Sequence, residues 1–167
     1  MTIEASRLSV SWMDDRRIFL QLSLLRLHSC DFHALMLSLL SMTDKTVMII
    51  EDEEDAAELF AEMMRVSGFR VLKTSKSAPA IAMMTENKPD VVLLDIMMPE
   101  ISGLDILRKM QNDPNLAGIP VIVVTAKSMP TDIKNGMEAG AFTYLTKPVG
   151  YIELKEAVER ALGSTTA

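Results

Sequence analysis

The sequence is poor in cysteine, in clustered basic residues and in long uninterrupted apolar runs. Cys30 is the only cysteine among 167 residues, which excludes an internal disulfide and fits a reducing cytoplasm. The net charge of −6 argues against general nucleic-acid binding, because phosphate contacts need clustered lysine and arginine. Hydrophobic residues make up 49% and charged residues 24%, so the composition is that of an ordinary globular protein.

Residues 1–43 differ in composition from the rest of the chain. They are rich in leucine and serine, contain no lysine, and have no net charge. An apolar stripe at alternating spacings of four and three predicts one amphipathic helix that binds a partner or forms a coiled coil. The stripe comprises Ile18, Leu22, Leu25, Ser29, Phe32, Met36 and Leu39. Arg26 and Asp31 interrupt it, so no transmembrane span is expected.

Two further features of this segment bear on its origin. His28, Cys30 and His33 lie in too short a span to match a common zinc pattern, so a metal site is disfavoured. Met42, followed by Thr43, resembles a natural start of a domain. Two interpretations stay open: upstream sequence read from an early start codon, or a native helix that docks on a partner.

From residue 46 onward, short apolar runs alternate with helix-like segments. The runs are Thr46–Ile50, Phe69–Lys73, Val91–Leu94, Val121–Thr125 and Ala141–Leu145. Three of them are continuously apolar, as expected of strands buried on both faces. Gly68 and Gly163 are expected to end the first and the last helix. The alternation predicts an α/β fold with a parallel sheet and helices on both faces.

Polar side chains gather where the predicted strands end. Glu51 and Asp52 follow the first strand, Asp95 follows the third, Thr125 ends the fourth, and Lys147 follows the fifth. In open parallel sheets, ligands bind beyond these carboxyl ends. Each residue alone is compatible with an ordinary loop or surface position. Together, however, they favour a single site.

That set of side chains suits phosphoryl transfer. Three carboxylates repel one another unless a cation joins them, and oxygen ligands without histidine or cysteine suit Mg²⁺. A metal ion, an ammonium group and a hydroxyl can stabilise the equatorial oxygens of a transferring phosphoryl group. One carboxylate can then act as the nucleophile.

The segments IIEDEED, LLDIMMPEISGLD, VIVVTA and YLTKP resemble the receiver domain of chemotaxis-type response regulators. The resemblance covers nearly all of residues 44–163. It implies a doubly wound (βα)5 flavodoxin-like sandwich with strand order 2-1-3-4-5. Residues 1–43 would then be an N-terminal extension, helical or disordered, and residues 164–167 a tail.

The resemblance also implies a reaction in the cytoplasm. Asp95 would be the phosphoacceptor, served by a histidine kinase or phosphotransfer protein. Glu51, Asp52 and Asp95 would bind Mg²⁺, together with the backbone carbonyl of Met97. The protein would be no enzyme beyond catalysing its own phosphorylation and dephosphorylation.

A switch is implied as well. Thr125 and Lys147 would contact the phosphoryl oxygens, with a cis peptide bond between Lys147 and Pro148. Tyr144 would be the switch aromatic that turns inward as Thr125 moves. The altered surface would comprise the fourth helix, fifth strand and fifth helix of the domain. With no output domain after Gly163, we expect it to act on a downstream protein.

The sequence departs from the family pattern at two positions and lacks residues that rival functions need. Phe142 and Thr143 replace acidic residues that a salt-bridged dimer would need. A phosphatase of the haloacid-dehalogenase type needs a second aspartate where Met97 stands, and no glycine-rich loop for a nucleotide follows the first strand. The remaining alternative is a degenerate receiver that binds proteins independently of phosphorylation.

Overall fold

The computed structural model describes residues 44–99 and 102–164. The predictions for residues 1–43, including the helical stripe, the His28–His33 group and the start at Met42, lie outside the described residues. So do residues 165–167 of the predicted tail.

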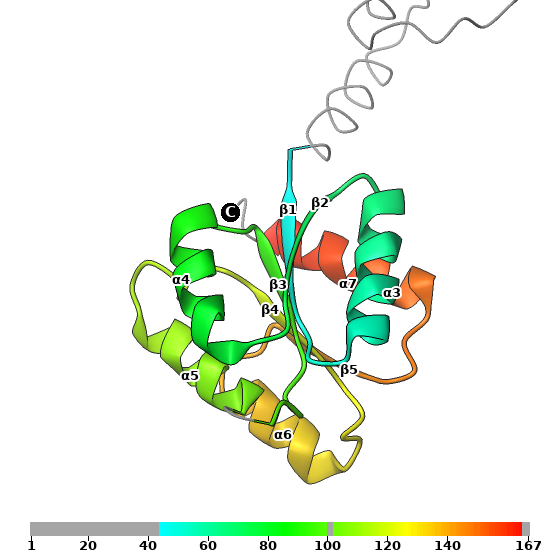
Figure 1. Cartoon of the computed structure of the whole chain (residues 1–167). Helices are drawn as coiled ribbons and strands as arrows, with labels where there is room; N and C mark the ends of the chain where they lie inside the picture. Colours follow the sequence, from blue (N-terminus) through cyan, green and yellow to red (C-terminus); the bar gives the residue numbers. More distant parts are fainter. Residues whose placement is uncertain (1–43, 100–101, 165–167) are drawn as a thin grey trace, which may run out of the picture. The chain divides into compact units, whose positions relative to one another are not determined.

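Strands and helices alternate strictly along the described chain (Figure 1). The strands are β1 (Thr46–Ile50), β2 (Arg70–Thr74), β3 (Val91–Leu94), β4 (Val121–Thr125) and β5 (Thr143–Thr146). The helices are α3 (Glu54–Val66), α4 (Ser77–Asn87), α5 (Gly103–Asn112), α6 (Pro130–Glu138) and α7 (Tyr151–Ser164). No helix in this part of the chain is long and apolar enough to cross a membrane.

The five strands form one parallel sheet in the order β2-β1-β3-β4-β5. β1 lies between β2 and β3, with Val47 opposite Val71 on one side and Val91 on the other. This order confirms the predicted doubly wound fold. It also places the ends of β1, β3, β4 and β5 along one edge of the sheet.

Each face of the sheet is covered by a separate apolar layer, because successive side chains of a strand point to opposite faces. Val47 and Ile49 pack with α3 and α7, whereas Met48 and Ile50 pack with α4 and α5. Figure 1 shows these helix pairs on opposite sides of the sheet. The sheet is therefore buried on both faces, and polar residues are left to its edges.

Some predicted boundaries were wrong. β2 runs from Arg70 to Thr74 rather than from Phe69 to Lys73. Phe69 lies outside the strand because its N–H donates to the Met64 carbonyl at the end of α3. β5 runs from Thr143 to Thr146 rather than from Ala141 to Leu145. Gly163 does not end the last helix, since α7 continues to Ser164. Gly68, with φ of 89°, does follow the end of α3 as predicted.

Candidate functional site

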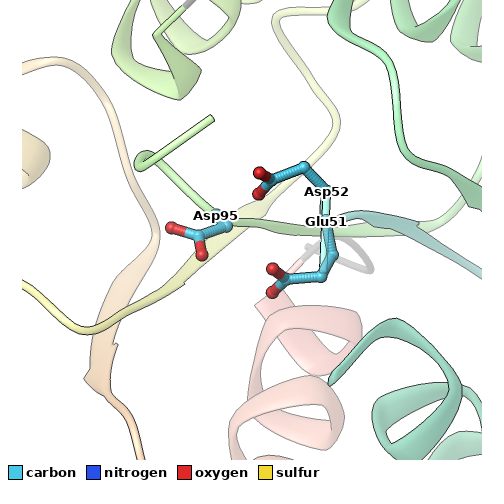
Figure 2. A group of neighbouring side chains, drawn as sticks. All are labelled: Glu51, Asp52 and Asp95. Carbon is cyan, nitrogen blue, oxygen red and sulfur yellow. The ribbon is translucent and has the colours of Figure 1, made fainter. Parts of the chain in front are cut away.

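Three carboxylates meet at the carboxyl edge of the sheet. Glu51 and Asp52 follow β1, and Asp95 follows β3 beside it; an oxygen from each lies within 4.8 Å of the other two. Figure 2 shows the three side chains close together, with the carboxyl groups of Glu51 and Asp52 on the side that faces Asp95. The Asp95 N–H donates to the Ile50 carbonyl at 2.9 Å, which fixes Asp95 against the end of β1. The sequence-predicted acids are therefore brought together.

The three acids differ in exposure. Glu51 and Asp95 are 2% and 6% exposed, while Asp52 faces solvent. One oxygen of Asp95, Oδ1, accepts a hydrogen bond from the Met97 N–H at 2.8 Å. This contact involves the Met97 amide; a metal contact through its carbonyl stays a prediction.

Lys147 supplies the positive charge of the site. Its Nζ lies 2.5 Å from Glu51 Oε2 and 2.7 Å from Asp95 Oδ2, and 5.8 Å from the centre of the Phe60 ring. The peptide bond to Pro148 is cis, and the Lys147 N–H donates to the Thr125 carbonyl at 2.8 Å. The ammonium therefore bridges the carboxylates of Glu51 and Asp95.

For both Glu51 and Lys147, burial and the hydrogen bonds of the site shift the pKa in opposite directions. Burial raises the pKa of Glu51, and the charge of Asp95 adds to that rise, while the hydrogen bond from Lys147 opposes it. Burial alone would lower the pKa of Lys147, but its hydrogen bonds to Asp95 and Glu51 outweigh burial and raise it. Lys147 therefore stays an ammonium.

The three carboxyl groups share a single ammonium, that of Lys147. The donors are carboxylate oxygens alone. Hard divalent cations prefer such oxygen ligands, whereas softer metals prefer nitrogen or sulfur. The residues present therefore fit Mg²⁺, with Glu51, Asp52 and Asp95 as the side chains that can hold it.

The hydroxyl side of the site lies on β4 and β5. Thr125 is fully buried, and its Oγ1 accepts from the Lys127 N–H at 3.5 Å. Tyr144, from β5, donates its hydroxyl to the Lys127 carbonyl at 3.0 Å. Burial raises the pKa of the Tyr144 phenol, with smaller contributions from the charges of Asp132 and Asp95. Thr125 and Tyr144 thus both contact Lys127.

Two glycines shape the site although the sequence predicted no role for them. A side chain on Gly103 would place its Cβ 2.2 Å from the Asp95 carbonyl oxygen, so only glycine lets α5 begin this close to the site. Gly136 similarly lies against the ring of Tyr144. Each glycine is only eight positions from the residue it approaches, but no sequence pattern marks the contact, which depends on how the strand and the helix pack.

Comparison with known proteins agrees with this geometry. Residues 47–159 match the response regulator receiver domain, and the chain belongs to that family. The polar-differentiation response regulator DivK of Brucella anthropi is 35% identical over 119 residues, which are 71% of this chain and 97% of that protein. Its relative in Brucella ovis is equally similar.

Solved structures give the same result. A response regulator receiver domain protein from Clostridium thermocellum is 31% identical with a TM-score of 0.67, over 72% of this chain and 95% of the other. The receiver domain of a Pseudomonas aeruginosa PAO1 sensor histidine kinase is 26% identical, also with a TM-score of 0.67, over 72% and 98% of the two chains. That structure has a magnesium ion coordinated in its active site cleft.

Proposed function

We propose that Asp95 accepts a phosphoryl group from the phosphohistidine of a histidine kinase or phosphotransfer protein. The observation that carries this proposal is the arrangement around Asp95: a buried carboxylate beside Glu51 and Asp52, with Lys147 Nζ 2.7 Å away. In the reaction, an Asp95 oxygen forms a bond to phosphorus. The bond from phosphorus to the histidine nitrogen breaks, and its electron pair stays on the imidazole.

Mg²⁺, bound by Glu51, Asp52 and Asp95, would neutralise charge on the phosphoryl oxygens. A coordinated magnesium ion in the related kinase receiver supports this assignment. Lys147 would donate to a phosphoryl oxygen from its present place beside Asp95, and Thr125 would do so with its hydroxyl. Hydrolysis by water would later restore the carboxylate.

Intact-mass measurement tests the acceptor. The full chain, incubated with acetyl phosphate and Mg²⁺, should gain the mass of one phosphoryl group, and Asp95→Asn should gain none. Asp105→Asn, a change of an exposed aspartate on α5, is the matched control and should label normally. Labelling of Asp95→Asn at the normal rate would refute Asp95 as acceptor. Failure of the unaltered chain to label would favour the phosphorylation-independent binding module.

The output would be a changed surface on α6, β5 and α7 that binds a downstream protein. Met129, Ile133 and Met137 are 66%, 37% and 44% exposed on and just before α6, giving this surface apolar contact area. The Brucella anthropi relative is covered over 97% of its length, so a regulator of this kind can consist of little more than the receiver. Amide hydrogen exchange of α6 should change on phosphorylation of the unaltered chain and not in Asp95→Asn.

A further inference from the structure

Gly136 lies inside α6 with the ring of Tyr144 against it. A Cβ added to Gly136 would lie 2.7 Å from Tyr144 Cδ2 and 2.8 Å from Cε2. Real side chains do not approach this closely, so the ring occupies the space that a methyl group would need. Gly136 is buried, whereas most of α6 is exposed.

The backbone does not explain this glycine. Within the described residues, the glycines with positive φ are Gly68 and Gly140, so Gly136 has an ordinary helical backbone. Glycine inside a helix is less favourable than alanine because it loses more conformational freedom on folding. Because α6 has only nine residues, one glycine inside it makes this helix clearly less favourable to form. Space for the Tyr144 ring is what glycine provides.

The place of the ring decides what its hydroxyl contacts. With the ring against Gly136, the Tyr144 hydroxyl donates to the Lys127 carbonyl at 3.0 Å. The N–H of the same residue, Lys127, donates to Thr125 Oγ1 at 3.5 Å. A continuous series of contacts therefore runs from the Thr125 hydroxyl to the middle of α6.

We propose that Gly136 is a positioning residue for Tyr144: it holds the ring where the phenol binds the Lys127 carbonyl, and so couples α6 to the Thr125 hydroxyl. The role of Thr125 as a phosphoryl contact rests on the proposed function, whereas the packing of Tyr144 on Gly136 does not. A methyl group at position 136 displaces the ring, breaks the bond to Lys127 and uncouples α6 from Thr125.

Fluorine NMR of the full chain labelled with 3-fluorotyrosine tests the position of the ring. The chain has two tyrosines, and Tyr151→Phe identifies the Tyr144 signal. Gly136→Ala should shift that signal and increase its dependence on the H₂O/D₂O ratio, since the ring becomes more exposed. Gly118→Ala is the matched control, because an added Cβ there has no neighbour within 4 Å. An unchanged Tyr144 signal in Gly136→Ala would overturn the inference.

A second measurement separates positioning from general stability. Without the Tyr144 side chain, Gly136→Ala should raise Tm, since only the gain in helix propensity remains. With Tyr144 present, the same substitution should raise Tm less or lower it. Equal Tm shifts in the Tyr144→Ala background and in the unaltered chain would mean that the two residues are not coupled.

Coupling to phosphorylation has its own readout. After acetyl phosphate treatment, Gly136→Ala should label at Asp95 yet lose the change in α6 amide exchange seen in the unaltered chain. Normal labelling with an unchanged exchange response and an unchanged fluorine spectrum defeats the Gly136 inference alone. A shifted fluorine spectrum without any labelling of the unaltered chain defeats the proposed function alone.

Discussion

Lys147 Nζ lies 2.7 Å from Asp95 Oδ2, although 52 positions separate these residues in the chain. The same ammonium contacts Glu51 at 2.5 Å. One cation thus compensates two buried carboxylates that would otherwise repel each other. We expect this arrangement to set both the net charge of the site and the rate at which Asp95 is phosphorylated.

Replacing Lys147 should slow phosphorylation of Asp95 with little effect on the fold's secondary structure. Lys147→Met keeps much of the apolar length but removes the donor, and loss of one such donor lowers rates on the order of 10²-fold. The rate of mass gain with acetyl phosphate and Mg²⁺ measures the effect. Lys109→Met, on the exposed face of α5, should label at the normal rate. Equal rates in both variants would remove Lys147 from the mechanism.

Mg²⁺ should stabilise the folded chain through the three carboxylates. At a concentration of about 100 times Kd, a ligand that binds only the folded protein adds about 2.7 kcal/mol. Asp52 is exposed, so Asp52→Asn should change Tm little in EDTA but should lose most of the Mg²⁺-dependent rise. Thermal unfolding with and without Mg²⁺ measures this difference.

Glu86→Gln is the matched control, because Glu86 is an exposed acid on α4 outside the cluster. It should retain the full Mg²⁺-dependent rise in Tm. The metal assignment would fail if Asp52→Asn and Glu86→Gln responded to Mg²⁺ alike.

Glu58 should contribute a pH-dependent part of the stability. Hydrogen bonds from Lys73 and Arg65 lower its pKa from 4.5 to about 2. A lowered folded-state pKa gives stability that is present above pH 4.5 and disappears as the pH falls toward 2. The urea midpoints of the unaltered chain and Glu58→Gln should therefore differ at pH 7 and converge over that interval.

Salt provides a second check on Glu58, because its ion pairs lie at the surface. The difference between the two midpoints should shrink at high ionic strength. A difference that persists unchanged at pH 2 would show that lost packing, rather than charge, causes the effect.

Gly103→Ala should destabilise the protein strongly, although it adds only one methyl group. The new methyl group would lie 2.2 Å from the Asp95 carbonyl oxygen and 2.7 Å from the Ile96 Cα, both in the backbone. Overpacking of this kind costs about 1–3 kcal/mol. Urea unfolding should show the loss, whereas Gly118→Ala should change stability by less than about 0.5 kcal/mol. Equal stability of the two variants would contradict the close approach of α5.

The sequence predicted the fold and the edge of the sheet that holds the acids, because buried parallel strands have a recognisable apolar pattern. It also placed Asp95 and Lys147 correctly at strand ends. It did not predict that Lys147 contacts Glu51 as closely as Asp95, since side-chain reach across a sheet has no sequence pattern. Nor did it predict the start of β2, where the Phe69 N–H bonds to the end of α3 instead of joining the sheet.

The strand order has a consequence for how the chain folds during synthesis. β1 is made first, yet its two neighbours in the sheet are β2 and β3. A ribosome must therefore deliver the chain through Leu94 before β1 can be paired on both sides. β4 and β5 can then join one after the other at the growing side of the sheet, so assembly follows the direction of translation once β3 has emerged.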